Sequence, residues 1–157
     1  MKGEMTKAIP LRNGMIAIVN DQDYARVMAH NWYASCPRKI WYAVTKIDGK
    51  VVSLQRFIMR PPPEHQVDHV NGNPLDCRRS NMRPCTNKEN SRNRGPRSDS
   101  PWPYKGIRRR YGHWTARVRS DGITHDLGTF DSPEAAARAY DTAAVEHHGA
   151  FARLNFP

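Results

Sequence analysis

Apolar and polar side chains alternate along the stretch His113-Trp114-Thr115-Ala116-Arg117-Val118-Arg119-Ser120. Trp114, Ala116 and Val118 occupy every second position, and the residues between them are polar or basic. Since successive side chains of a strand point to opposite faces of its sheet, the stretch predicts a strand with one apolar and one basic face. We expect the apolar face to be buried against another element and the arginines to stay exposed.

The residues on either side supply the other elements of that fold. Asp121-Gly122 is a hairpin-turn pair that leads into a second strand, Ile123 to Phe130, and a further strand is predicted at Tyr104 to Arg110. An Ala-rich helix from Pro133 to about His148 follows, with Asp131 or Ser132 as its cap and Gly149 at its end. Because small side chains allow close packing, we expect this helix to cover the apolar face of a three-stranded sheet.

The basic residues are concentrated in one block of the chain. The 157 residues have a formal net charge of +10 and a pI of about 10.0. Residues 78–119 hold 13 Lys and Arg, 11 of them Arg, against two acids, so this block has a charge of +11 and the remainder −1. Such a balance favours a polyanion as partner. Acidic membranes also attract basic chains, so charge alone does not decide the partner. The apolar run Met15 to Val19 is far shorter than the roughly 20 residues that span a bilayer, so we expect no membrane-spanning segment and no membrane partner.

The chain has three cysteines, Cys36, Cys77 and Cys85, and no CxxC pair. An odd number without that spacing argues against disulfides and against a four-ligand zinc site. The first 15 residues contain charged side chains and Pro10, so we recognise no signal peptide. These features predict a reduced, cytoplasmic protein.

Composition and turn residues divide the chain into four parts. We predict a strand-rich unit at residues 1–60 and a second unit, which begins with three prolines, at 61–94. A linker is predicted at 95–103, and the sheet and helix described above occupy 104–157. In the first unit we expect a strand at Met15 to Val19, a helix from about Gln22 to Trp32 capped by Asn20-Asp21, and a hairpin of strands Ile40 to Lys46 and Lys50 to Leu54. In the second we expect strands at Gln66 to Val70 and near Asn81 to Cys85, and a helix from Thr86.

A spaced set of polar residues in the second unit carries a family resemblance. The segment Val67-Asp68-His69-Val70-Asn71-Gly72-Asn73, followed by Asn81 and Glu89-Asn90, resembles the HNH endonucleases, especially the phage and intron-encoded homing type. The resemblance covers roughly Gln66 to Arg94, with an upstream portion at Leu54 to Pro62. It implies a ββα-metal unit that hydrolyses phosphodiester bonds of DNA with the help of a metal ion.

The chemistry of these residue types agrees with that implication. Imidazole titrates near neutral pH, so His69 is the expected general base. Asp68 and Asn90 offer oxygen ligands, and so few protein ligands suit Mg²⁺, with Mn²⁺ as an alternative. By resemblance Asn81 would brace the loop that carries His69 rather than touch substrate. Arg79 and Arg83 are candidates for phosphate contact.

A second resemblance covers Tyr104 to Pro157. The motifs Tyr104-Lys105-Gly106-Ile107-Arg108-Arg109-Arg110, Leu127-Gly128-Thr129-Phe130 and Leu154-Asn155-Phe156-Pro157 are similar to the DNA-binding domain of plant ethylene-response factors of the Apetala-two type. That family lays its sheet in the major groove. The residues that would face DNA are then Lys105, Arg108, Arg110, Tyr111, His113, Arg117 and Arg119. Thr124 and Asp126 stand where plant members often have Arg and Trp, so the plant target sequence is not assumed.

Together these observations predict an α+β protein: a small ββα-metal nuclease unit followed by a three-stranded antiparallel sheet packed on one helix. We expect a monomer that nicks one strand of double-stranded DNA in the cytoplasm of a bacterial or phage-infected cell. One departure favours an alternative, a DNA-binding regulator with an inactive nuclease fold. Leu54-Gln55-Arg56 corresponds to a segment that reads Leu-His-Arg in many relatives, so Gln55 replaces the histidine. An RNA-binding module is a third alternative, although few aromatic residues suited to base stacking lie on the basic face.

Overall fold

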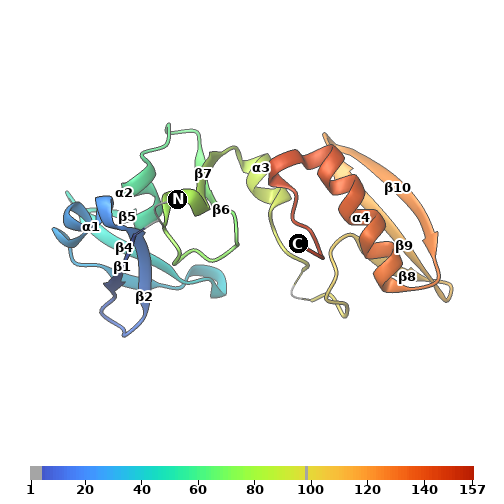
Figure 1. Ribbon diagram of the computed structural model, residues 1–157, viewed down its shortest axis with the longest axis horizontal. Coiled ribbons are helices and arrows are strands. Elements are labelled where there is room, and N and C mark those ends of the chain that lie inside the picture. The colour runs from blue at the N-terminus through green and yellow to red at the C-terminus, as the bar shows by residue number, and fades with distance from the viewer. Residues whose placement is uncertain (1–4, 98) are drawn as a thin grey trace. The chain divides into compact units, whose positions relative to one another are not determined.

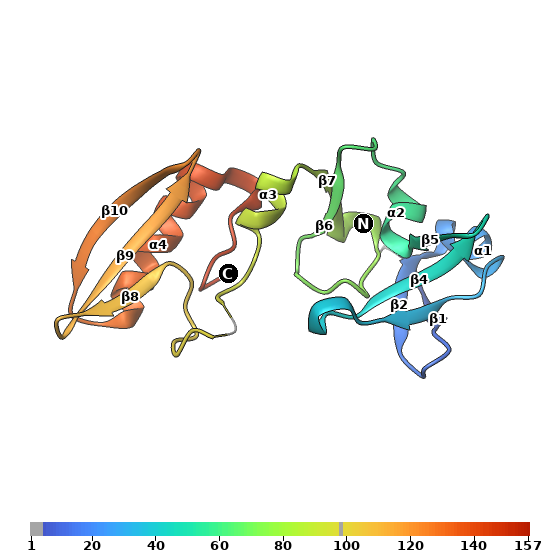
Figure 2. The same ribbon diagram turned by 180° about the vertical axis from the view of Figure 1, so that it is seen from behind.

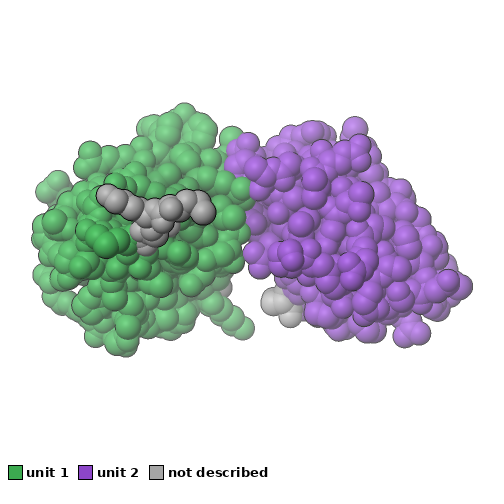
Figure 3. Space-filling view, in the orientation of Figure 1, with its two compact units in different colours: residues 1–87 green, residues 88–157 purple. Residues whose placement is uncertain are grey.

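The computed structural model describes residues 5–97 and 99–157, and it divides into two compact units, Met1–Asn87 and Lys88–Pro157 (Figure 3). Both units combine helices with antiparallel sheets, so the predicted α+β class is confirmed. Ser98, in the predicted linker, and the first four residues lie outside the described part. No helix within the described part is long and apolar enough to cross a bilayer.

The first unit contains three small antiparallel sheets and two helices that follow one another along the chain (Figure 1). Its elements are β1 (Thr6–Pro10), β2 (Ile16–Asn20), α1 (Asp21–Met28), β3 (Tyr33–Ser35), a 3-10 helix (Pro37–Lys39), β4 (Tyr42–Ile47), β5 (Lys50–Ser53), α2 (Leu54–Met59), β6 (Gln66–His69), a second 3-10 helix (Arg79–Asn81) and β7 (Met82–Cys85). β1 pairs with β2, β4 lies between β3 and β5, and β6 pairs with β7.

A single apolar core explains why residues 1–87 group together although the sequence predicts a boundary near residue 60. Side chains from both predicted parts share it, since Val19 and Leu54 from the first part pack with Cys77 and Met82 from the second. The backbone links them too: the Ile18 amide donates to the Leu75 carbonyl at 2.8 Å, and the Cys77 amide donates to the Ile18 carbonyl at 2.8 Å. The β6–β7 hairpin therefore lacks a separate core of its own.

Helix α1 begins near the predicted position but ends at Met28, four residues before the predicted end at Trp32. The Val27 carbonyl accepts from the Trp32 indole Nε1 at 2.8 Å and from the His30 amide at 3.1 Å, so it is no longer available to continue the helix. Trp32 is buried beyond the helix end. Asn20 precedes the helix as expected, but its side chain makes no capping hydrogen bond.

The remaining elements of the first unit are partly as predicted. Strands β2, β4, β5, β6 and β7 lie within two residues of their predicted bounds. Asp48 and Gly49 both have positive φ, 49° and 77°, which agrees with the predicted hairpin turn. The sequence did not predict β1, β3 or helix α2.

The second unit consists of α3 (Asn87–Arg92), which begins at the last residue of the first unit, and then β8 (Ile107–Arg110), β9 (His113–Ser120), β10 (Ile123–Phe130), α4 (Pro133–His148) and a 3-10 helix (Gly149–Phe151). The predicted bounds of β9, β10 and α4 are confirmed, and the sheet order is β10-β9-β8. β8 starts three residues later than predicted. Gly106 precedes it at φ +80°, and a Cβ there would lie 1.9 Å from the Tyr140 ring.

Helix α4 lies against one face of the sheet, as the two opposite views show (Figures 1 and 2). Trp114 and Ala116 of β9 pack with Ala136 and Ala137 of α4, which confirms the predicted packing of the Ala-rich helix on the apolar sheet face. The helix is capped by Ser132, whose hydroxyl oxygen accepts from the Ala135 amide at 3.1 Å.

Candidate active site and nucleic-acid interface

The β6–β7 hairpin holds Asp68 and His69 at the end of a strand. In its register Asp68 lies opposite Arg83, and His69 lies opposite Met82. Two adjacent strand residues point to opposite faces unless the strand ends, and β6 does end at His69. The Gly72 amide donates to the His69 carbonyl at 2.8 Å to close the turn that follows, and Gly72 has a φ of 76°. Both Asp68 and His69 are buried, at 5% and 6% exposure.

The carboxylate of Asp68 is held from across the hairpin by Arg83. Arg83 donates from Nε at 2.9 Å and from Nη2 at 2.7 Å, both to Asp68 Oδ2. Buried charges need such partners, since an isolated buried carboxylate is costly. Arg83 was predicted as a phosphate contact, and the structure instead makes it the partner of the predicted metal ligand.

The imidazole of His69 is neutral at physiological pH. Burial lowers its pKa to about 4, although the nearby carboxylates of Asp68 and Asp76 act in the opposite direction. Its Nε2 lies 3.9 Å from the Cys77 Sγ. Burial raises the pKa of the Cys77 thiol to about 12, so this neighbour also stays uncharged. A neutral imidazole is the form that can accept a proton.

A hydrogen-bond network around Asn81 braces the loop between β6 and β7. The Asn81 side chain accepts from the Asn71 amide at 2.9 Å, and it donates to the Asn71 Oδ1 at 3.0 Å and to the Asp76 carbonyl at 2.8 Å. Asp76 is bound by Arg78 at 2.6 and 2.7 Å, and these contacts lower its pKa despite burial. This is the geometry expected for a bracing residue. Sequence reasoning gave Asp76 no role, because only the folded loop brings it against Asn71.

Arg79, the other predicted phosphate contact of this unit, is bound to Asp23 of α1. Its Nε and Nη2 donate to the two carboxylate oxygens at 2.8 and 2.9 Å, and Arg26 binds the same carboxylate at 2.6 Å. Burial raises the pKa of Asp23, but the two arginines outweigh it and the pKa is lowered. Asp23 is 2% exposed, so Arg79 is a buried-charge partner that ties the second 3-10 helix to α1.

Asn90, the last predicted site residue of the nuclease segment, lies in the second unit. Asn90 is on α3, within Lys88–Pro157, whereas Asp68, His69 and Asn81 lie in Met1–Asn87. The joint binding of a metal ion by Asp68 and Asn90 therefore stays a prediction from their spacing. Gln55 lies on α2 and is 8% exposed, and its Oε1 is buried without a hydrogen-bond partner within the described part of the chain.

The free face of the second unit's sheet carries the predicted cations. Directly opposed residues of antiparallel strands share a face, so the register assigns side chains to faces. Arg110 lies opposite His113, Arg108 opposite Thr115, Arg117 opposite Asp126, and Arg119 opposite Thr124. The four arginines and His113 are exposed, on the face opposite the buried Trp114, Ala116 and Val118. Arg109 shares the helix face, 5.9 Å from the Trp114 ring.

Two of the predicted DNA-facing residues lie apart from this face. Lys105 precedes β8, and its ammonium donates to the Arg92 carbonyl. Burial, and to a lesser degree Arg153, lower its pKa to about 8, so Lys105 is part of the packing around α3 and not of the exposed face. Tyr111 is 88% exposed at the β8–β9 turn, where it and Gly112 have φ of 49° and 84°.

Comparison with known proteins agrees with the nuclease resemblance. Residues 60–92 match the profile of the HNH endonuclease family. An uncharacterized HNH endonuclease of Acanthamoeba polyphaga mimivirus is 32% identical over 149 residues, which cover 90% of this chain and 75% of that protein. The chain belongs to the HNH endonuclease family.

The plant resemblance is also found, over part of the chain. An ethylene-responsive transcription factor of Arabidopsis thaliana is 53% identical over 58 residues, and an APETALA2-like protein of Oryza sativa is 46% identical over 65 residues. These matches cover 35% and 40% of this chain, and 32% and 15% of the plant proteins. The chain therefore spans a third or less of the length of these plant relatives.

Proposed function

We propose that the protein is a metal-dependent endonuclease of the homing type that nicks double-stranded DNA. The observation that carries the proposal is the pair Asp68 and His69 at the end of a buried hairpin, in a chain of the HNH endonuclease family. His69 would be the general base, and the arginine face of β8 and β9 would hold the DNA.

In this mechanism His69 takes the proton of a water molecule as its oxygen attacks the phosphorus. The bond from phosphorus to the leaving sugar oxygen then breaks. Because burial lowers the pKa of His69 to about 4, the imidazole is unprotonated at neutral pH, which is the form a general base needs, although a low pKa also weakens it as a proton acceptor. The network around Asn81 keeps the loop after His69 in one conformation, so the base does not have to be ordered when substrate binds.

The donor chemistry of the site fits a hard divalent cation. Asp68 offers carboxylate oxygens, while the high pKa of Cys77 leaves no thiolate beside His69. Mg²⁺ prefers oxygen ligands and keeps several waters, so Asp68 and the amide oxygen of Asn90 would suffice to hold it. When bound, the ion would stabilise negative charge on the phosphate and on the leaving oxygen.

The sheet of the second unit supplies the proposed DNA contacts. Arg108, Arg110, Arg117 and Arg119 form one exposed face, and guanidinium groups bind both phosphate and the guanine edge. The ethylene-responsive relatives named above are transcription factors, which agrees with DNA as the partner. Asp126, which stands where plant members often have Arg or Trp, lies opposite Arg117 on this face. The base preference of this sheet is therefore expected to differ from that of the plant transcription factors.

Nicking of a supercoiled plasmid tests the proposal. The protein with Mg²⁺ is expected to produce open circles, and chelation should stop the reaction. Loss of a general base costs about 10²–10⁴-fold, so His69→Ala should nick at least a hundredfold more slowly. His65→Ala is the matched control, because His65 lies just before β6 and has no proposed role. Equal rates for His69→Ala and the parent protein would refute the assignment.

The alternative is a DNA-binding regulator without nuclease activity. Gln55 favours it, because a buried acceptor without a hydrogen-bond partner in the described part occupies the position where many relatives have histidine. The same plasmid assay separates the two functions. Binding of duplex DNA without any Mg²⁺-dependent nicking would support the regulator.

A further inference from the structure

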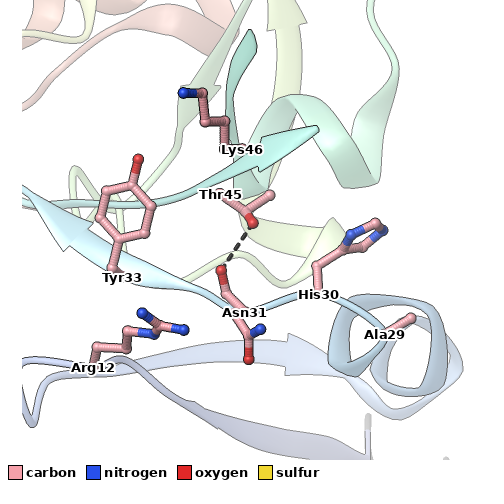
Figure 4. Close-up of a pocket in the computed structure, with 7 residues that line it drawn as sticks. All are labelled: Arg12, Ala29, His30, Asn31, Tyr33, Thr45 and Lys46. Atoms are coloured by element: carbon pink, nitrogen blue, oxygen red, sulfur yellow. Dashed lines mark hydrogen bonds between the residues drawn. The ribbon is translucent and has the colours of Figure 1, made fainter. Parts of the chain in front are cut away.

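A pocket in the first unit carries a concentration of donors that the proposed mechanism does not use. It has a volume of about 340 Å³ and is lined by residues of the β1–β2 turn, the segment after α1, and strands β3 and β4. Its polar lining residues are Arg12, His30, Asn31, Tyr33, Thr45 and Lys46, and in the view of Figure 4 Tyr33 lies between Arg12 and Lys46. None of the lining residues is acidic.

The charge of this pocket is not balanced locally. Residues 1–60 contain ten Lys and Arg against four Asp and Glu, and acidic residues in 61–77 and 120–157 offset this excess in the whole-chain sum. Two other cations of residues 1–60 have acidic partners: Lys7 lies 3.6 Å from Asp21, and Arg26 lies 2.6 Å from Asp23. Within residues 5–97 and 99–157, Arg12 and Lys46 have no acidic side chain within 4.0 Å.

The shape and lining of the pocket distinguish between kinds of anion. Sites for small metabolites are usually enclosed and mostly apolar, with volumes of about 300–1,000 Å³. This pocket is at the small end of that range, and Arg12, Ala29, Asn31 and Lys46 are all exposed. Two hydrogen bonds hold its walls: the Thr45 hydroxyl donates to the Asn31 carbonyl at 2.8 Å, and the Arg12 amide donates to the Trp32 carbonyl at 3.2 Å. An open, preformed, cationic hollow suits one phosphate of a polymer that continues beyond it.

We propose that this pocket binds a backbone phosphate of the substrate DNA, so that residues 1–60 form a second contact with the duplex, independent of the C-terminal sheet. Arg12 and Lys46 supply the charge, and the Tyr33 hydroxyl and Asn31 amide supply neutral hydrogen bonds to phosphate oxygens. The inference rests on DNA as the partner proposed above. It assigns a binding role to residues 1–60, which contain none of the proposed nuclease residues.

The test measures binding of the full-length protein to a non-specific duplex at a series of salt concentrations, with a chelator present to prevent cutting. Each phosphate contact contributes about 0.9 to the slope of log affinity against log salt, which is about a threefold change in affinity over a fourfold change in salt. Lys46→Glu and Arg12→Ala should each reduce that slope and weaken binding about threefold or more. Lys50→Glu is the matched control, since Lys50 is an exposed lysine of the neighbouring strand β5 outside the pocket, and it should change binding much less.

Two results would overturn the inference. Equal losses in Lys46→Glu and Lys50→Glu would show a general effect of charge and no site. Binding of inorganic phosphate by the parent protein, together with unchanged DNA affinity in Lys46→Glu, would identify a site for a free anion. Thermal unfolding of each variant checks that the fold is kept. Either result leaves the nicking assay on His69→Ala intact, so failure here is separate from failure of the proposed nuclease function.

Discussion

Acidification of the metal-free protein should destabilise the first unit through His69. Burial lowers its pKa from 6.5 to about 4. Between these values the unfolded chain binds a proton that the folded chain does not, so the free energy of unfolding falls as the pH falls. At about 1.4 kcal/mol per pH unit, the loss attributable to His69 is about 3 kcal/mol. It begins near pH 6.5 and levels off below pH 4, where the folded state also takes up the proton.

Two measurements check this prediction. Urea unfolding of the protein and of His69→Gln, in the presence of a chelator, should give a stability difference that changes by about 3 kcal/mol between pH 7 and pH 4. Comparison with the variant removes the contributions of the carboxylates. Proton NMR of the His69 ring should show its titration near pH 4. A ring that titrates near 6.5, together with parallel stability curves, would refute the claim that burial keeps this imidazole neutral.

Three further predictions concern the loop, the second unit and the sheet face. Asn81→Ala should lower the free energy of unfolding in urea by about 2–4 kcal/mol, because buried partners lose their hydrogen bonds; a change below about 1 kcal/mol would contradict the bracing role. Gly106→Ala should destabilise the second unit by about 3 kcal/mol in thermal melts, because the new Cβ strains the backbone and clashes with the Tyr140 ring of α4. Gly112→Ala is the control, since Gly112 has a similar φ but lies in open space, and it should cost about 1 kcal/mol. Arg117→Ala should reduce the salt dependence of DNA binding more than Arg109→Ala does, although both remove one charge, because only the first side chain lies on the free face; equal effects would contradict that assignment.

The second unit could be predicted almost element by element, because the residues that determine each of its strands, turns and helix ends lie within or next to that element. Alternation in His113–Ser120 sets the two faces of the strand, the pair Asp121-Gly122 sets the hairpin, and Ser132 caps the helix. Each of these features acts within a few residues of chain. The β6–β7 hairpin was predictable for the same reason.

The rest depended on contacts between distant residues. Nothing near Arg79 in the sequence indicates Asp23, which lies 56 positions earlier and becomes its partner only when α1 packs on the second 3-10 helix. Arg83 looked like a phosphate contact until the strand register placed it opposite Asp68. Lys105 matches a DNA-facing position of the plant family but turns towards α3. Ion pairs and burial are tertiary properties, so composition alone could not separate structural from exposed arginines.

The most direct test of the nuclease account compares cutting and binding in Asp68→Asn. This change keeps the shape of the side chain but removes the charge that Arg83 binds, so thermal unfolding of the variant is measured alongside to check that the hairpin is still folded. Under single-turnover conditions with Mg²⁺, the account predicts that nicking falls by at least about a hundredfold, while affinity for duplex DNA, measured on the same sample with a chelator, stays within about threefold of the parent protein. Nicking at an unchanged rate, or nicking by the parent protein without a divalent metal ion, would contradict the account.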